Sequence, residues 1–290
     1  MQYTVTHRTE YKYRSSVSLA QHLLHLRPRV TARQQVHAFQ LAIEPPIGVA
    51  HAHADYYGNH VDVVAIDLPH QSFVATSTAK LEVTAPTWPG ADTTPPWEEA
   101  RDAAPLELAD GQPIEFLFDS ERVAQSSTFR EYALESFSPK RPFLAALQDL
   151  TQRIYREFKF DAKATDVRTP IEEAFQKKRG VCQDFAHIGI ACLRSIGLPA
   201  RYVSGYLETT PPPGKPRLAG ADASHAWLAA WCPGLGWVDT DPTNNLFPGE
   251  RHLTIGWGRD YGDVSPIRGV AVGGGEHELK VAVDVVREVA

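Results

Sequence analysis

The fold is decided by the segment from Gly180 to Tyr206, which reads GVCQDFAHIGIACLRSIGLPARYVSGY. Its apolar residues recur three or four positions apart, and this spacing predicts an amphipathic helix that begins at Cys182. The Gly-Leu-Pro that follows is a conventional stop signal for that helix. Alternation over residues 201–207 then predicts a strand. The segment therefore places a thiol at the first position of a helix that leads directly into a sheet.

Further helices are expected before this segment and further strands after it. Residues 141–158 repeat the helical spacing, and Thr169 followed by Pro170 is a start signal for another helix. Alternation predicts later strands over residues 226–231, 236–240 and 279–286. This half of the chain is therefore expected to mix helices with a small sheet.

The first part of the chain is expected to form β structure. Period-two alternation runs through residues 3–7, 36–43, 61–67 and 72–78. These short strands predict a β-sandwich over residues 1–85. Six prolines between Ala85 and Pro113 predict an irregular connector, and residues 86–140 are assigned to it and to the first helices. Residues 141–290 then form a second domain, and the fold class is α+β.

Composition limits the classes of function. The chain has 290 residues and a formal net charge of −6, which argues against a general binder of nucleic acid or anionic membranes. No apolar run approaches a membrane span, and the N-terminus lacks the apolar core of a secretion signal. Three cysteines cannot form a disulfide framework. We therefore expect a cytoplasmic protein, and no cofactor is expected.

Cys182 is the first candidate for chemistry. The N–H groups and the positive dipole end of a helix stabilise a thiolate, which is the nucleophilic form of cysteine. The same N–H groups can donate to the oxyanion of a tetrahedral intermediate. The alternative is that Cys182 is simply a small buried apolar side chain.

His225 and Asp241 are the candidates for a partner base and its orienting carboxylate. His225 lies at the start of the predicted strand, directly before residues 226–231, where an imidazole can serve as general base for a thiol. The Gly-rich turn after that strand predicts a hairpin. A turn centred on Pro233 places Asp241 opposite His225, and one centred on Gly234 places it one diagonal step away. Asp239 is the reserve carboxylate. The three types of side chain together predict a Cys-His-Asp triad.

Other histidines and cysteines have competing interpretations. A metal site at His51, His53, Asp55 and His60 is less favoured than a polar outer strand face. A zinc site from Cys182, His187 and His225 is a second, minor possibility, and no metal is predicted. Cys192 fits the apolar stripe of its helix, whereas Cys232 precedes a turn proline and is expected to be incidental. Trp227 and Trp237 are candidates for substrate binding, although a core cluster explains them about as well.

Three motifs resemble one family. GVCQDFAHIGIACLRSIGLPARYVSGY, ASHAWLAAW and GWVDTDPTN, in this order, resemble the transglutaminase-like superfamily, specifically bacterial proteins with an N-terminal β domain. The resemblance implies a papain-like α+β catalytic domain after the β-sandwich, with Cys182 as nucleophile, His225 as base and acid, and Asp241 as orienting carboxylate. Gln183 is given only a weak supporting role in substrate binding. No residue matches the family's second oxyanion donor.

The expected chemistry is acyl transfer at an amide of a peptide or protein substrate. If water accepts the acyl group, the protein is a cysteine protease, peptidase or amidase, and this is the favoured interpretation. If an amine accepts it, the protein is a protein-glutamine transglutaminase. A non-catalytic peptide- or protein-binding module with a vestigial triad is the hypothesis from another class. The reactivity of the Cys182 thiol separates these classes. The sequence leaves the assembly state open.

Overall fold

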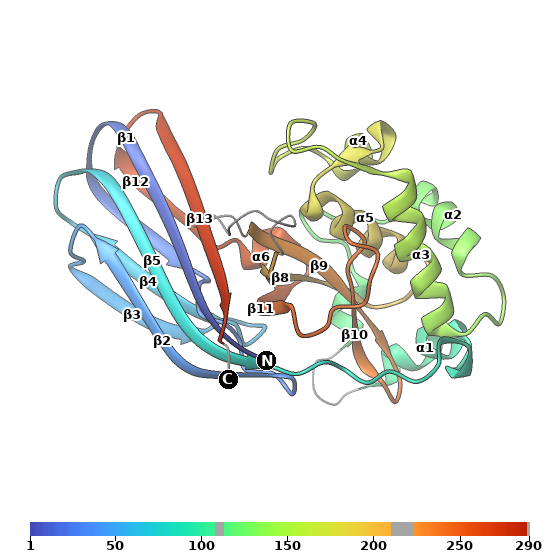
Figure 1. Ribbon diagram of the computed structural model, residues 1–290. Helices are drawn as coiled ribbons and strands as arrows, with labels where there is room; N and C mark the ends of the chain where they lie inside the picture. Colours follow the sequence, from blue (N-terminus) through green and yellow to red (C-terminus); the bar gives the residue numbers. More distant parts are fainter. Residues whose placement is uncertain (108–112, 210–222, 289–290) are drawn as a thin grey trace, which may run out of the picture.

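The computed structural model describes residues 1–107, 113–209 and 223–288. Two halves lie side by side, one built of long strands and the other of a small sheet covered by helices (Figure 1). The helices are α1 (Trp97–Ala103), α2 (Ser127–Ser136), α3 (Phe143–Glu157), α4 (Ile171–Lys177), α5 (Cys182–Ser195) and α6 (Tyr261–Val264), with 3-10 turns at Ala91–Thr93, Ala104–Leu106 and Pro113–Leu117. The predicted mixture of a β region and an α+β region is confirmed.

The β half, within the described residues, is a single curled sheet of seven strands (Figure 1). They are β1 (Gln2–Leu24), β2 (Gln34–Glu44), β3 (Val49–Ala54), β4 (His60–Ile66), β5 (His70–Val83), β12 (Ile267–Gly273) and β13 (His277–Arg287). The first half of β1 pairs with β5 and β13, and its second half pairs with β4 and β12. The register of β1 against β5 shifts between Lys12 and Val17, an irregularity of the kind that bends a strand. The long β1 thus joins two groups of strands.

The last two strands correct the predicted domain boundary. β13 pairs with β1 from Arg287 opposite Tyr3 to His277 opposite Tyr13. The C-terminal part of residues 141–290 therefore belongs to the N-terminal sheet and not to the α+β domain. Alternation identifies a strand by its own residues, but the neighbour that takes its backbone hydrogen bonds can come from any part of the chain.

The second half is organised around an antiparallel sheet with the order β10-β9-β8-β11. Its strands are β8 (Ala200–Leu207), β9 (Ala223–Cys232), β10 (Gly236–Thr240) and β11 (His252–Gly258). Helix α5 packs on β8 and β9, and α2, α3 and α4 pack around α5. A short parallel pair, β6 (Lys159–Phe160) and β7 (Arg179–Gly180), precedes α5. The predicted strand 226–231 lies within β9, and the predicted strands 201–207 and 236–240 correspond to β8 and β10.

Helix α5 is buried along almost its whole length, which fixes its position on the sheet. A Cβ atom on Gly189 would lie 2.6 Å from Leu228 Cδ2, so the glycine allows the helix to approach β9 closely. At the far end the buried Arg194 guanidinium donates to the carbonyl oxygens of Phe118, Ala200 and Arg259. Buried polar groups are stable only when they are hydrogen-bonded in this way. The helix is thereby held against the sheet at its middle and at its C-terminal end.

The β half covers the free edge of β11. The buried Gln34 side chain donates to Thr254 O at 2.6 Å and accepts from Thr254 N at 2.8 Å. The buried Asn59 side chain does the same for the backbone of Trp257, at 2.8 and 2.9 Å. Unpaired edge strands are otherwise exposed to wrong pairing. An apolar cluster that includes Tyr3, Leu81, Val283, Tyr206, Leu253 and Ile255 joins the same two sheets. The two halves are therefore firmly attached.

None of the described helices is both long enough and apolar enough to cross a membrane.

Candidate active site

Cys182 is the first residue of α5 and follows the N-cap residue Val181. Its side chain is partly exposed. The N–H groups of the first helical residues, Cys182 and Gln183 among them, have no acceptor within the helix. They point out of the helix end that carries the positive dipole charge. The thiol therefore lies where an anion is stabilised, as the sequence predicts.

The start of α5 is fixed by a buried carboxylate. Asp184 Oδ2 accepts hydrogen bonds from Val181 N and from Thr165 Oγ1, both at 2.7 Å. Burial is the main reason that the pKa of Asp184 is raised. A Cβ atom on Gly180 would lie only 2.4 Å from Asp184 Oδ2. The glycine before the thiol is thus required by the carboxylate that caps the helix.

The hairpin of β9 and β10 brings a histidine and an aspartate together. His225 is the third residue of β9, and Asp241 directly follows β10. Thr240 pairs with Leu228, which centres the turn at Gly234 and leaves Asp241 one diagonal step from His225. Of the two registers predicted, this is the second. His225 Nε2 lies 2.8 Å from Asp241 Oδ2.

The carboxylate of Asp241 is buried and surrounded by donors. Its Oδ2 atom lies 2.8 Å from His225 Nε2, 3.0 Å from His252 Nε2 and 2.7 Å from Asn244 Nδ2. Its Oδ1 atom accepts from the backbone N–H groups of Thr243 and Asn244, at 2.9 and 3.2 Å. A carboxylate with several donors is strongly favoured in its charged form. Asp241 is therefore a fixed negative charge beside His225.

His225 and Asp241 each stabilise the charged form of the other. Burial alone lowers the pKa of His225, but its hydrogen bonds to Asp241 and Cys182, with the charges of both, raise that pKa to about 10. Burial opposes the charge of Asp241, yet its bonds to His225 and His252 hold the pKa of that carboxyl below its usual range. An imidazolium between a carboxylate and a sulfur can stabilise a thiolate and later give up a proton.

Two family models and several relatives match this chain. Residues 3–82 match the bacterial transglutaminase-like N-terminal region, and residues 130–242 match the transglutaminase-like superfamily. The uncharacterized protein Rv2569c of Mycobacterium tuberculosis is 41% identical over 293 residues, which cover 98% of this chain and 92% of that protein. The chain belongs to the transglutaminase-like superfamily.

Two further relatives match different shares of this chain. A protein-glutamine gamma-glutamyltransferase of Pseudomonas aeruginosa is 30% identical over 109 residues, which cover 35% of this chain and 16% of that enzyme. The crystal structure of "a Putative Cysteine Protease from Cytophaga hutchinsonii" has a TM-score of 0.76 and 22% identity, and it covers 100% of this chain and 92% of that one. The transglutaminase-like fold is thus shared along the whole chain.

Two site residues of this transglutaminase-like chain were missed by sequence reasoning. Asn244 lies in the turn Asp-Pro-Thr-Asn, where an aspartate side chain commonly binds the N–H groups that follow it, so a local signal was present. His252 is the first residue of β11 and approaches Asp241 only because β11 lies beside β8. No local pattern could have identified it.

The two tryptophans predicted to bind substrate lie in different surroundings. The side chain of Trp227 is 0% exposed and packs with Val203 and Ala229, so the prediction that it binds substrate is wrong. It lies on the sheet face opposite the one that packs on α5, and its indole is close to the rings of His225 and His252. Trp237 lines a separate pocket, where Arg201 lies over its ring.

The other residues weighed from the sequence have structural partners. The reserve carboxylate Asp239 forms an ion pair with Arg33 at 2.5 Å. His187 Nε2 accepts the backbone N–H of Tyr261, so it is not directed at a metal. Cys192 is buried in the core as predicted. Cys232 is also fully buried in the main core, which corrects the view that it is incidental.

His51 and His53 lie on an outer face of the β half. β3, which carries His51 and His53, is exposed throughout, and their rings stack 5.8 Å apart. Among the residues that the structure describes, only His225, Asp241 and His252 place ligand atoms close enough to hold a metal, within 4.8 Å of one another. Because those atoms already hydrogen-bond to each other, a metal would compete with the proton network of the site.

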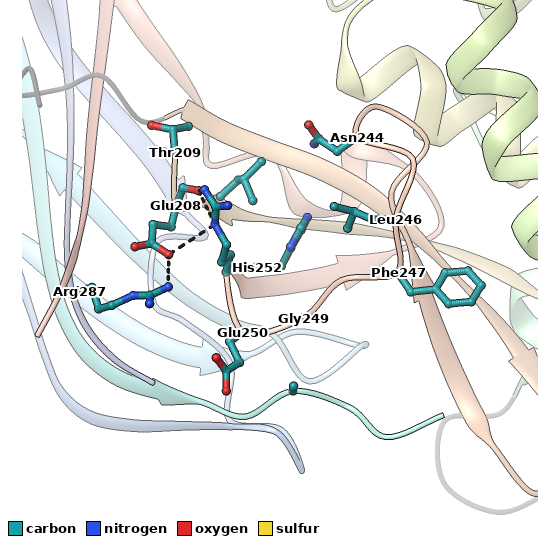
Figure 2. A pocket seen from close by; sticks show the side chains of 12 residues that line it. Glu208, Thr209, Asn244, Leu246, Phe247, Gly249, Glu250, His252 and Arg287 are labelled. Carbon is teal, nitrogen blue, oxygen red and sulfur yellow. Dashed lines mark hydrogen bonds and ion pairs between the residues drawn. The ribbon is translucent and has the colours of Figure 1, made fainter. Parts of the chain in front are cut away.

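Two pockets adjoin residues of the site. Gln183, next to the thiol, lines a pocket of about 400 Å³ with Arg122 and Arg168. Asn244 and His252 line a second pocket of about 710 Å³. In the view of Figure 2, Glu208 and Arg287 lie at one end of this second pocket and Asn244 at the other, with His252 between them. Space therefore adjoins the residue after the thiol and two of the residues that hold Asp241.

Proposed function

We propose that this protein catalyses thiol-dependent acyl transfer at amide bonds, with Cys182 as nucleophile, His225 as proton carrier and Asp241 as orienting carboxylate. The observation that carries the proposal is the position of His225, which contacts both the carboxylate of Asp241 and the sulfur at the start of α5. A histidine that only stabilises the core would not have to lie beside a thiol at the start of a helix.

The reaction follows from these positions. The Cys182 sulfur attacks the carbonyl carbon of the amide, and the backbone N–H groups at the start of α5 donate to the oxygen that becomes negative. The C–N bond breaks as His225 gives its proton to the leaving amine, which leaves a thioester on Cys182. His225 then takes a proton from water, whose oxygen attacks the thioester and releases an acid and the free thiol.

We propose hydrolysis, as in a cysteine protease, peptidase or amidase, as the principal reaction on a peptide or protein substrate. The pockets beside Gln183 and Asn244 offer space near the triad for groups of a peptide chain, which supports this proposal. Transamidation is the second candidate, and the partial identity with the Pseudomonas aeruginosa protein-glutamine gamma-glutamyltransferase favours it. An amine would then replace water at the thioester.

A peptide library followed by mass spectrometry tests both candidates. The protein is incubated with the library, with and without a primary amine, and Cys182→Ala serves as the control. Chain cleavage supports a protease, conversion of glutamine to glutamate supports an amidase, and amine incorporation supports a transglutaminase. Alkylation with iodoacetamide tests the site itself: Cys182 should react rapidly near pH 7, and His225→Ala should abolish that advantage.

Equal and slow alkylation of all three cysteines would contradict the enzyme and favour a binding module with an inactive triad. We further propose that the protein acts in the cytoplasm, where a reducing environment keeps the Cys182 thiol free. Cell fractionation followed by immunodetection of the protein tests this location.

A further inference from the structure

The carboxylate of Asp241 is shared by two imidazoles, and one of them comes from a strand that the β half holds in place. His252 Nε2 lies 3.0 Å from the same Oδ2 atom that His225 approaches at 2.8 Å. Because a charged carboxylate only accepts hydrogen bonds, this contact requires a proton on His252 Nε2. His252 is buried, its ring packs edge-on against Trp227, and its Nδ1 atom has no partner.

This arrangement gives Asp241 Oδ2 a second imidazole donor, on a different strand from His225. The turn residues Thr243 and Asn244 hold Oδ1, but Oδ2 would otherwise be set only by His225 and the Asn244 amide. A second imidazole donor fixes the rotation of the carboxylate and therefore the direction in which His225 is held. The partner of a catalytic group commonly acts in this way, by orienting it.

His252 is in turn positioned by the β half. Two residues along β11, the backbone of Thr254 is bound on both its N–H and its carbonyl by Gln34. The neighbouring Arg33 forms an ion pair with Asp239, two residues before Asp241 on β10. One turn of the N-terminal sheet thus holds both strands that carry the carboxylate and its second imidazole.

We propose that His252 is a positioning residue for Asp241. The N-terminal sheet holds β11 through Gln34, and it thereby helps to orient His225, the base that serves Cys182. The inference rests on the proposed function, since a positioning residue presupposes the Cys-His-Asp reaction. It gives the N-terminal domain a role in catalysis beyond attachment.

The test uses the full chain and the alkylation rate of the Cys182 thiol, which needs no known substrate. His252→Phe keeps the ring but removes the donor, whereas His252→Gln can return an N–H to the position of Nε2. Loss of one hydrogen bond to a charged group corresponds to about a tenfold to hundredfold change. We expect His252→Phe to slow alkylation near pH 7 by that factor, and His252→Gln to recover most of the rate.

The pH profile separates positioning from a general loss of structure. With Asp241 poorly oriented, the His225 imidazolium is less stabilised, so the rise of the alkylation rate should move to higher pH in His252→Phe. Thermal melting should show both variants folded at the assay temperature. A rate and profile for His252→Phe equal to those of the wild type would overturn the inference, as would a slow His252→Gln that is no better than His252→Phe.

A matched pair of variants tests the contribution of the N-terminal sheet. Gln34→Ala and Asn59→Ala each remove an amide that binds both backbone groups of one residue of β11, but Asn59 acts at Trp257, farther from His252. Gln34→Ala should slow alkylation at least threefold more than Asn59→Ala. Equal effects would overturn the role of the sheet. A wild-type thiol that is unreactive would instead contradict the proposed function, so the two failures are distinguishable.

Discussion

Replacing Asp241 by Asn should separate the charge of the site from its shape. The substitution is isosteric, but it removes the negative charge that, with the thiolate, raises the pKa of His225 from 6.5 to about 10. Burial continues to oppose the imidazolium and the Cys182 sulfur continues to favour it, so the pKa of His225 should fall toward its ordinary value of about 6.5.

The size of the effect follows from these two values. At about pH 8 an imidazole with a pKa of about 10 is almost fully protonated, whereas one with a pKa of about 6.5 is about 3% protonated. The population of the thiolate–imidazolium pair should therefore fall by up to about thirtyfold in Asp241→Asn. The second-order rate constant for alkylation of Cys182 by iodoacetamide, measured by mass spectrometry from about pH 5 to 9, reports this population. Its rise with pH should move to higher pH.

The raised pKa of His225 should also make the stability of the folded protein depend on pH. A group whose pKa is raised on folding stabilises the folded protein below its unfolded pKa, and that contribution is lost as the pH rises through the folded value. His225 should thus stabilise the wild type in mildly acidic and neutral solution and lose this effect toward about pH 10. Asp241→Asn should remove that pH dependence from the melting temperature.

Asp55→Asn is the matched control, because Asp55 also faces an imidazole, that of His25 at 3.6 Å, but in the β half. It should alter stability and leave the alkylation of Cys182 within about twofold of the wild type. If Asp241→Asn alkylates as fast as this control, with the same pH profile, then Asp241 does not hold the imidazolium and the electrostatic reasoning is refuted.

Three other perturbations give sharp expectations. Gly180→Ala places a methyl group 2.4 Å from Asp184 Oδ2, so it should lower the free energy of unfolding, measured with denaturant, by about 1–3 kcal/mol and slow the labelling of Cys182. Gly249→Ala, with open space around it, should do neither. Cys192 and Cys232 are 0% exposed and burial raises the pKa of both thiols, so peptide mapping should find them alkylated only after denaturation; their labelling in the native protein would contradict the core packing. Zn²⁺ should bind the two imidazoles and the carboxylate of the site and thereby inhibit thiol alkylation reversibly, and this inhibition should weaken as the pH falls. Inhibition that persists in His252→Phe would point to another zinc site.

Local chemistry could be read directly from the sequence. The start of α5 was predicted from the apolar spacing and the stop signal, and the thiol at its first position followed from that boundary. The hairpin register of β9 and β10 was narrowed to two choices by its Gly-rich turn, and one of them is the register found. These predictions succeed because helix periodicity and turn geometry act over a few neighbouring residues.

Long-range pairing could not be predicted in the same way. The strand predicted at residues 279–286 exists, but it pairs with β1 at the opposite end of the chain and extends the N-terminal sheet. Trp227 was a candidate for substrate binding, but its side chain is fully buried, and the sequence does not record what covers that face of the strand. His252 carries no local signal and approaches Asp241 only through the packing of β11.

The sequence by itself therefore determined which residues are candidates for the reaction: a thiol at a helix start, an imidazole on a strand and a carboxylate across a short turn. Each of these is a property of a local segment, set by backbone periodicity, capping and turn chemistry. Only the tertiary structure decided how the carboxylate is held, since its second imidazole, and the glutamine that fixes the strand bearing it, come from distant parts of the chain. Hydrogen bonds between remote segments depend on the packing of whole sheets, and no spacing along the chain records them.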